Sequence, residues 1–65
     1  MDDNDIVNLV RVVVENAARS GEMLFPGHEA NQILETYPNC RVPFDVLRYE
    51  IIKLATAQGV PVDDI

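Results

Sequence analysis

Residues 4–19 read NDIVNLVRVVVENAAR, and the spacing of their polar side chains decides the fold. One set of polar side chains recurs in steps of four, three, four and four residues: Asn4, Asn8, Arg11, Glu15 and Arg19. An α-helix repeats every 3.6 residues and a strand every two, so this spacing predicts a helix. Valine, which is frequent here, favours strands by about a few tenths of a kcal/mol per residue. The polar stripe outweighs that preference, and we predict a helix over residues 6–20 with Asp5 as its N-cap.

Glycine and proline divide the rest of the chain into two further helical segments. Glycine typically follows the last turn of a helix, and proline stops one. These residues lie at Gly21, Pro38, Gly59 and Pro61. They predict helices over residues 28–36, with Gly27 as cap, and 43–58, with Pro43 in the first turn. The C-terminal tail, residues 60–65, is too apolar for a free end and is expected to pack back on the helices. The predicted fold is all-α, a compact three-helix bundle in a single domain.

The helix over residues 6–20 carries more apolar surface than a surface helix needs. The predicted centre of its buried face consists of Ile6, Leu9, Val10, Val13 and Ala17. Val7, Val14 and Ala18 widen this face to about half of the circumference, whereas a surface helix typically shows a stripe of roughly 100°. We therefore expect Val7 and Val14 to contact another protein.

A second apolar surface is predicted on the back of the helix over residues 43–58. The core stripe of this helix consists of Phe44, Leu47, Ile51, Leu54 and Ala55. Val46, Tyr49 and Ile52 lie away from that stripe, and Val46 and Tyr49 are about 60° apart on a helix of 3.6 residues per turn. Tyrosine is enriched in the hot spots of interfaces. These residues predict a non-enzymatic protein–protein interaction module that self-associates or forms a subunit of a larger assembly.

The composition limits the classes of function. A chain of 65 residues with one cysteine cannot form an internal disulfide, and a core of this size supplies roughly 3–5 kcal/mol. Self-association or a protein partner would add buried area. The lone cysteine and an acidic N-terminus without a signal-peptide pattern favour a cytoplasmic location. No apolar run approaches the roughly 20 residues that span a bilayer, so no membrane contact is expected.

Residues suited to catalysis or metal binding are scarce. A nucleophile–base pair of Cys40 and His28 is conceivable, but it needs a third, orienting group and a pocket. One histidine, one cysteine and scattered acids do not make the clustered ligand set of a zinc site. We therefore predict no enzymatic activity, no cofactor, no metal and no small-molecule substrate.

A helix-turn-helix protein is the first alternative, because it also contains three short helices. The helix over residues 43–58 would contact DNA, and Arg41, Arg48 and Lys53 would supply positive charge. A net charge of −6 disfavours contact with a phosphate backbone. Arg48 and Lys53 also point about 140° apart, so they do not form one basic stripe. A nucleic-acid-binding regulator or an antitoxin-like domain remains the alternative interpretation.

A second alternative comes from a family resemblance within residues 23–52. The chain contains Met23-Leu24-Phe25-Pro26, then Ile33, then the pair Ile51-Ile52. These residues resemble the Met-Phe-Pro and di-leucine elements of CUE-type ubiquitin-binding domains, which are also three-helix bundles. The resemblance implies a ubiquitin-binding surface formed by Met23, Phe25, Pro26, Ile51 and Ile52.

Overall fold

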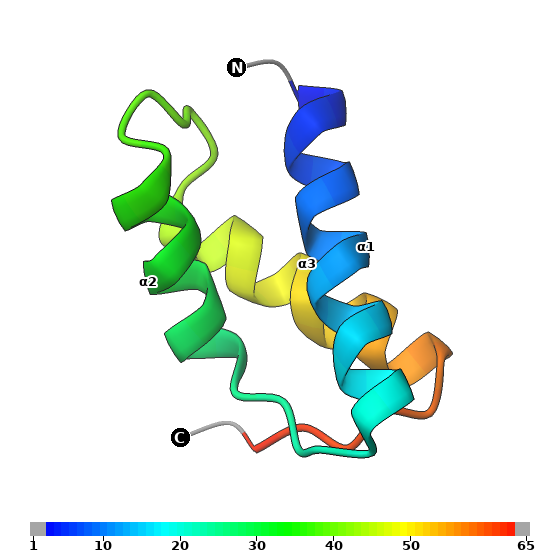
Figure 1. Ribbon diagram of the computed structural model, residues 1–65. Coiled ribbons are helices and arrows are strands. Elements are labelled where there is room, and N and C mark those ends of the chain that lie inside the picture. Colours follow the sequence, from blue (N-terminus) through cyan, green and yellow to red (C-terminus); the bar gives the residue numbers. More distant parts are fainter. Residues whose placement is uncertain (1–2, 64–65) are drawn as a thin grey trace.

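The computed structural model describes residues 3–63, with side chains from Asp5 onward. Its helices are α1 (Asp3–Ser20), α2 (Pro26–Thr36) and α3 (Phe44–Ala57). Apart from one isolated bridge, these residues contain no strand. Figure 1 shows α1 and α2 upright, with α3 crossing behind both of them. The all-α three-helix prediction is confirmed.

Helix α3 is the centre of the structure. It packs against both α1 and α2, which make few contacts with each other. Leu47, Ile51 and Ala55 follow one another at steps of four residues on α3 and are fully buried. The apolar core around them consists of Ile6, Val10, Val14, Leu24, Ala30, Ile33, Leu47, Ile51, Ala55 and Val60. Burial of apolar surface on this one face of α3 is therefore the main force that holds the other elements in place.

The buried stripe of α1 differs from the predicted one. Val14 is fully buried, and it lies on the same face of α1 as the buried Ile6 and Val10. Leu9 and Val13, which were predicted at the centre of the face, are only partly buried. The reason is that α3 covers one side of α1, whereas α2 hardly reaches the other side. The most deeply buried stripe is therefore displaced toward α3.

The first two helices begin earlier than predicted. Helix α1 begins at Asp3, so Asp5 lies within its first turn and is not the N-cap. Helix α2 begins at Pro26 after Phe25, so Gly27 lies within the helix and is not its cap. Proline suits the first helical position because its φ is preset and its missing N–H has no helical partner to lose. Both corrections lie within the few residues by which helix ends are commonly misjudged.

Helix α3 ends in a glycine-capped turn. Pro43 precedes it as N-cap with φ −64° and ψ 156°, so the helix starts one residue later than predicted. At the other end Gly59 has φ +73°, in the left-handed region. The N–H of Val60 donates to the carbonyl of Ala55 at 2.8 Å, and the N–H of Gly59 to that of Thr56 at 3.2 Å. This pair of bonds is a Schellman motif, which satisfies carbonyls that the helix leaves unpaired.

We expect Gly59→Ala to lower the free energy of unfolding by about 1 kcal/mol, because a side chain in the left-handed region costs roughly 1–2 kcal/mol. A Cβ at this position meets no atom within 4 Å, so the whole loss comes from the backbone. Gly21 has φ +72° and equally open surroundings, and Gly21→Ala should behave alike. Denaturant titration followed by circular dichroism measures both losses. An unchanged midpoint in either variant would show that the left-handed conformation is not required.

The C-terminal tail pairs with the segment between α1 and α2. The N–H of Leu24 donates to the carbonyl of Pro61, and the N–H of Asp63 donates to the carbonyl of Leu24, both at 2.9 Å. Leu24 and Val62 form a parallel bridge, and Val60 is buried. The predicted packing of the tail is confirmed up to Asp63, and residues 64–65 lie outside the described part.

Candidate functional site

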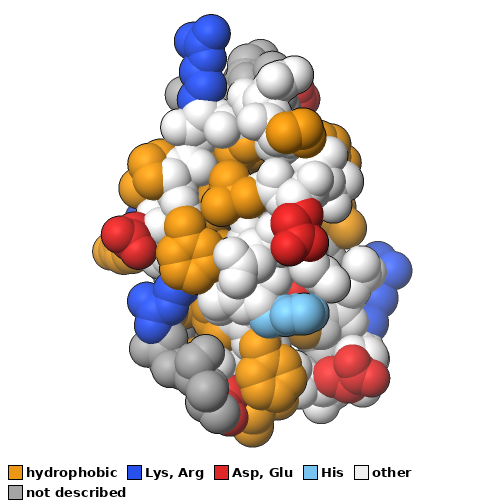
Figure 2. Space-filling model, turned by 90° about the vertical axis from the view of Figure 1, so that its left-hand side faces the viewer, with side chains coloured by type: hydrophobic (Ala, Val, Ile, Leu, Met, Phe, Trp, Pro, Cys, Tyr) orange, Lys and Arg blue, Asp and Glu red, His pale blue; other side chains and the backbone are white. Residues whose placement is uncertain are grey.

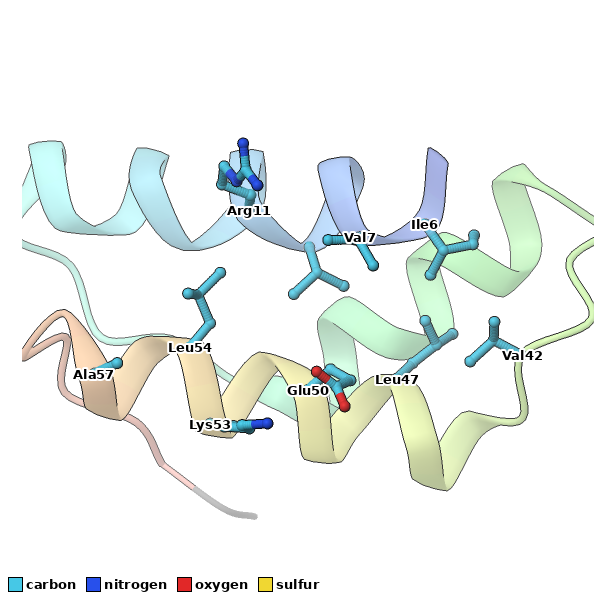
Figure 3. A pocket seen from close by; sticks show the side chains of 10 residues that line it. Ile6, Val7, Arg11, Val42, Leu47, Glu50, Lys53, Leu54 and Ala57 are labelled. Carbon is cyan, nitrogen blue, oxygen red and sulfur yellow. The ribbon is translucent and has the colours of Figure 1, made fainter. Parts of the chain in front are cut away.

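An apolar groove lies between α1 and α3. It has a volume of about 230 Å³ and is open to solvent on one side. Its walls are formed by two helices and the loop before α3 (Figure 3), with the lining residues Ile6, Val7, Val10, Arg11, Val42, Leu47, Glu50, Lys53, Leu54 and Ala57. Ligand and peptide sites are typically concave and mostly apolar with a few polar groups, and this groove has that character.

The floor and the rim of the groove differ in burial. Ile6, Val10 and Leu47 form a buried floor that belongs to the core. Val7 lies at the rim of the groove, and 54% of its surface is exposed although its side chain is apolar. Leu54 is partly buried and faces α1 across the groove (Figure 3). The groove is therefore a continuation of the core that reaches solvent.

The groove carries charges of both signs on its rim. Arg11, Glu50 and Lys53 line it and are exposed. Figure 3 shows Val7 and Arg11 on the α1 side of the groove, and Glu50 and Lys53 on the α3 side. The rim of the groove therefore carries one acidic and two basic side chains.

The predicted contact residues are placed in three different environments. Val14 has 0% of its surface exposed, so a partner cannot reach it and its prediction as a contact residue is wrong. Val7 lies on the groove rim, and Val46 and Tyr49 are 46% and 56% exposed on α3. Ile52 is half-buried.

The structure relates two of these residues that the sequence treats as separate. Val46 is four residues before Glu50 and eleven before Ala57, so it shares their face of α3. Val7 lines the groove from α1, whereas Val46 is not a lining residue and lies beside the groove on α3. Tyr49 lies about 60° further around α3 and extends this surface away from α1. Leu54 and Glu50 were not predicted as part of this surface, because Leu54 was assigned to the core and Glu50 was given no role.

The opposite side of the molecule presents a different surface. Figure 2 shows hydrophobic side chains on the α2 side scattered among charged and other polar ones. Isolated exposed apolar side chains are normal on protein surfaces. The groove between α1 and α3 is the more informative feature, because its apolar residues are contiguous.

The residues considered for chemistry do not form a site. His28 is exposed in the first turns of α2, whereas Cys40 follows the other end of this helix and is half-buried. A helix of 11 residues is about 16 Å long, so the two side chains are not a nucleophile–base pair. The Cys40 thiol lies 3.8 Å from the carbonyl oxygen of Val42. Within the described residues, no three His, Cys, Asp or Glu side chains are grouped so that they could hold a metal ion.

The residues of the two alternative functions differ in burial. Arg48 is half-buried, and Lys53 lines the groove between α1 and α3. Of the five residues in the CUE-like set, Pro26 and Ile51 are buried in the core. Met23 and Phe25 are exposed beside α2.

Comparison of the chain with protein-family models, with curated proteins and with solved structures gives no match. No helix within residues 3–63 is long and apolar enough to cross a bilayer. A function for this protein must therefore be argued from the groove itself.

Proposed function

We propose that this chain is a non-enzymatic protein–protein interaction module of the cytoplasm, and that its contact surface is the groove between α1 and α3. The observation that supports this proposal is the exposure of Val7 at the rim of an apolar groove that is continuous with the core. Fully burying a valine is worth roughly 1.5–3 kcal/mol, so a partner that covers Val7 gains part of this energy.

The shape and composition of the groove suit a protein ligand. Two helices border it (Figure 3), and a groove between helices can accept the apolar face of a further helix. Val46 and Tyr49 extend the surface beyond the groove on α3. The exposed charges of Arg11, Glu50 and Lys53 would form a polar rim around an apolar centre, as in ordinary interfaces.

Site-specific photo-cross-linking in cells tests this proposal. A photoreactive amino acid replaces Val7 in one variant and Val12 in the other. Val12 is the matched control, because it is a valine on the same helix with 52% of its surface exposed and does not line the groove. We expect a protein adduct from position 7 and none, or a much weaker one, from position 12.

The cross-linked protein is then purified and its affinity is measured for Val7→Gln and Val12→Gln. Glutamine is a good helix former, so both variants should remain folded. We expect Val7→Gln to weaken binding at least tenfold and Val12→Gln to leave it unchanged. Equal adducts from positions 7 and 12, or no adduct from position 7, would refute the groove as a contact surface.

A further inference from the structure

We propose that the occupant of the groove is a second copy of this chain, which packs antiparallel about a two-fold axis perpendicular to α3. This inference rests on the proposed role of the groove as a contact surface. It adds the identity of the partner, the direction in which it lies and the pairs of side chains that meet.

The exposed stripe of α3 is self-complementary when its direction is reversed. The stripe consists of Val46, Glu50, Lys53 and Ala57, which are all exposed. Their steps of four, three and four residues read the same in both directions, and the four side chains lie within about 60° on a helix of 3.6 residues per turn. An antiparallel copy therefore places apolar Val46 opposite the partner's Ala57. The same reversal places Glu50 opposite the partner's Lys53.

The α1 side of the groove obeys the same symmetry. Along the groove in Figure 3, Val7 and Leu47 lie toward one end and Arg11 and Ala57 toward the other, so a two-fold axis perpendicular to α3 exchanges these two ends. The end of one groove that carries Val7 then lies toward the end of the other that carries the partner's Arg11, and Glu50 lies opposite the partner's Lys53. The aliphatic part of an arginine side chain can cover a valine while its guanidinium stays near water. Opposite charges and apolar contacts are thus matched in one arrangement.

The charges also exclude the opposite orientation. In a parallel pair Glu50 would lie opposite the partner's Glu50, and Lys53 opposite the partner's Lys53. Like charges that face each other across an interface are unfavourable. The reversed arrangement is therefore the one that a symmetric pair would adopt.

The distribution of acidic residues favours a second copy over a basic partner. The chain has a net charge of −6, so two copies repel each other in most orientations. Among the acidic side chains that the structure describes, Glu50 alone lines the groove, together with the cations Arg11 and Lys53. Two copies that meet through their grooves keep their other acids away from the interface. A basic partner would instead meet Arg11 and Lys53.

Charge-reversal variants test the pairing of Glu50 with the partner's Lys53. Glu50→Lys makes both symmetric pairs Lys–Lys, and Lys53→Glu makes both Glu–Glu. We expect each single variant to raise the dimer dissociation constant about tenfold or more, as measured by light scattering or analytical ultracentrifugation. The double variant Glu50→Lys/Lys53→Glu restores opposite charges and should dimerise like the wild type.

Mixing the two single variants provides the decisive observation. In a mixed pair, both lysines of one chain face both glutamates of the other, so the mixture should form heterodimers more readily than either variant alone forms homodimers. Glu35→Lys is the control for net charge, because Glu35 is exposed on α2 and lies outside the groove. It should dimerise like the wild type, and circular dichroism should show that every variant is folded.

Two outcomes would overturn the second copy as occupant. In the first, the wild-type chain stays monomeric at all concentrations. In the second, the single variants and their mixture associate as strongly as the wild type. Neither outcome would decide the proposed function, because the cross-link from position 7 would then identify a different protein in the groove. The absence of that cross-link would refute the groove itself.

Discussion

Leu47→Ala should leave most of the protein unfolded at room temperature. Leu47 is fully buried on α3 and also forms part of the groove floor, so it contacts the elements on which the fold depends. Replacing a buried leucine by alanine typically costs about 2–5 kcal/mol through lost transfer energy and a residual cavity. A core of this size supplies only roughly 3–5 kcal/mol in total. Far-UV circular dichroism at one fixed protein concentration should show a large loss of helical signal.

Leu54→Ala is the matched control for this effect. Leu54 lies seven residues further along the same helix but is only partly buried. The same substitution there should lower the free energy of unfolding by about 1 kcal/mol and leave the chain folded. Equal losses from the two variants would mean that the buried face of α3 is not centred on Leu47.

Val14→Asp should unfold the protein as completely as Leu47→Ala. Val14 has none of its surface exposed and no buried polar side chain lies among the described residues. An aspartate there would place an unpaired carboxylate in the core, which costs several kcal/mol even after local relaxation. Thermal unfolding should show no cooperative transition, in contrast to the wild type.

Val7→Asp and Val12→Asp separate this core effect from any general cost of aspartate in α1. Both valines are about half exposed, so these variants should stay folded and lose about 1 kcal/mol or less. If Val14→Asp unfolded no more easily than they do, then position 14 would be accessible and its original prediction as a contact residue would be restored.

The helices could be predicted from sequence because their signals are local. The polar period of residues 4–19 depends only on spacing along the chain, and so do Gly21 and Gly59 at the ends of α1 and α3. The helix starts were less accurate, because several polar or small residues near Asp5 and Gly27 could serve as caps. Which one does so depends on contacts made by the rest of the fold.

The burial of Val14 could not be predicted, because it depends on which neighbour covers which side of α1. A helical wheel gives the width of an apolar face, whereas its centre follows from the position of α3 and the near absence of contact with α2. An even distribution of neighbours would have buried Val13 more deeply than Val14. The structure has the opposite order.

The groove could not be predicted from the sequence, although some of its residues could be predicted as contact residues. Val7 was predicted as a contact residue, but nothing in the spacing along the chain predicts that it lines one groove with Glu50 and Leu54. That proximity follows from the packing of α1 on α3. The symmetric spacing of Val46, Glu50, Lys53 and Ala57 can be seen in the sequence. It suggests an interface only because the structure shows that all four side chains are exposed.

The molar mass of the chain in solution tests the groove and its occupant together. Light scattering is recorded for the wild type, Val7→Gln and Val12→Gln from about 10 μM to about 1 mM, the range in which weak interfaces associate. We predict that the wild type and Val12→Gln rise from the chain mass of 7.3 kDa toward twice this value, whereas Val7→Gln stays at 7.3 kDa. A wild type that remains at 7.3 kDa throughout would contradict a second copy as the occupant, and an equal rise in all three chains would contradict the groove as the interface between copies.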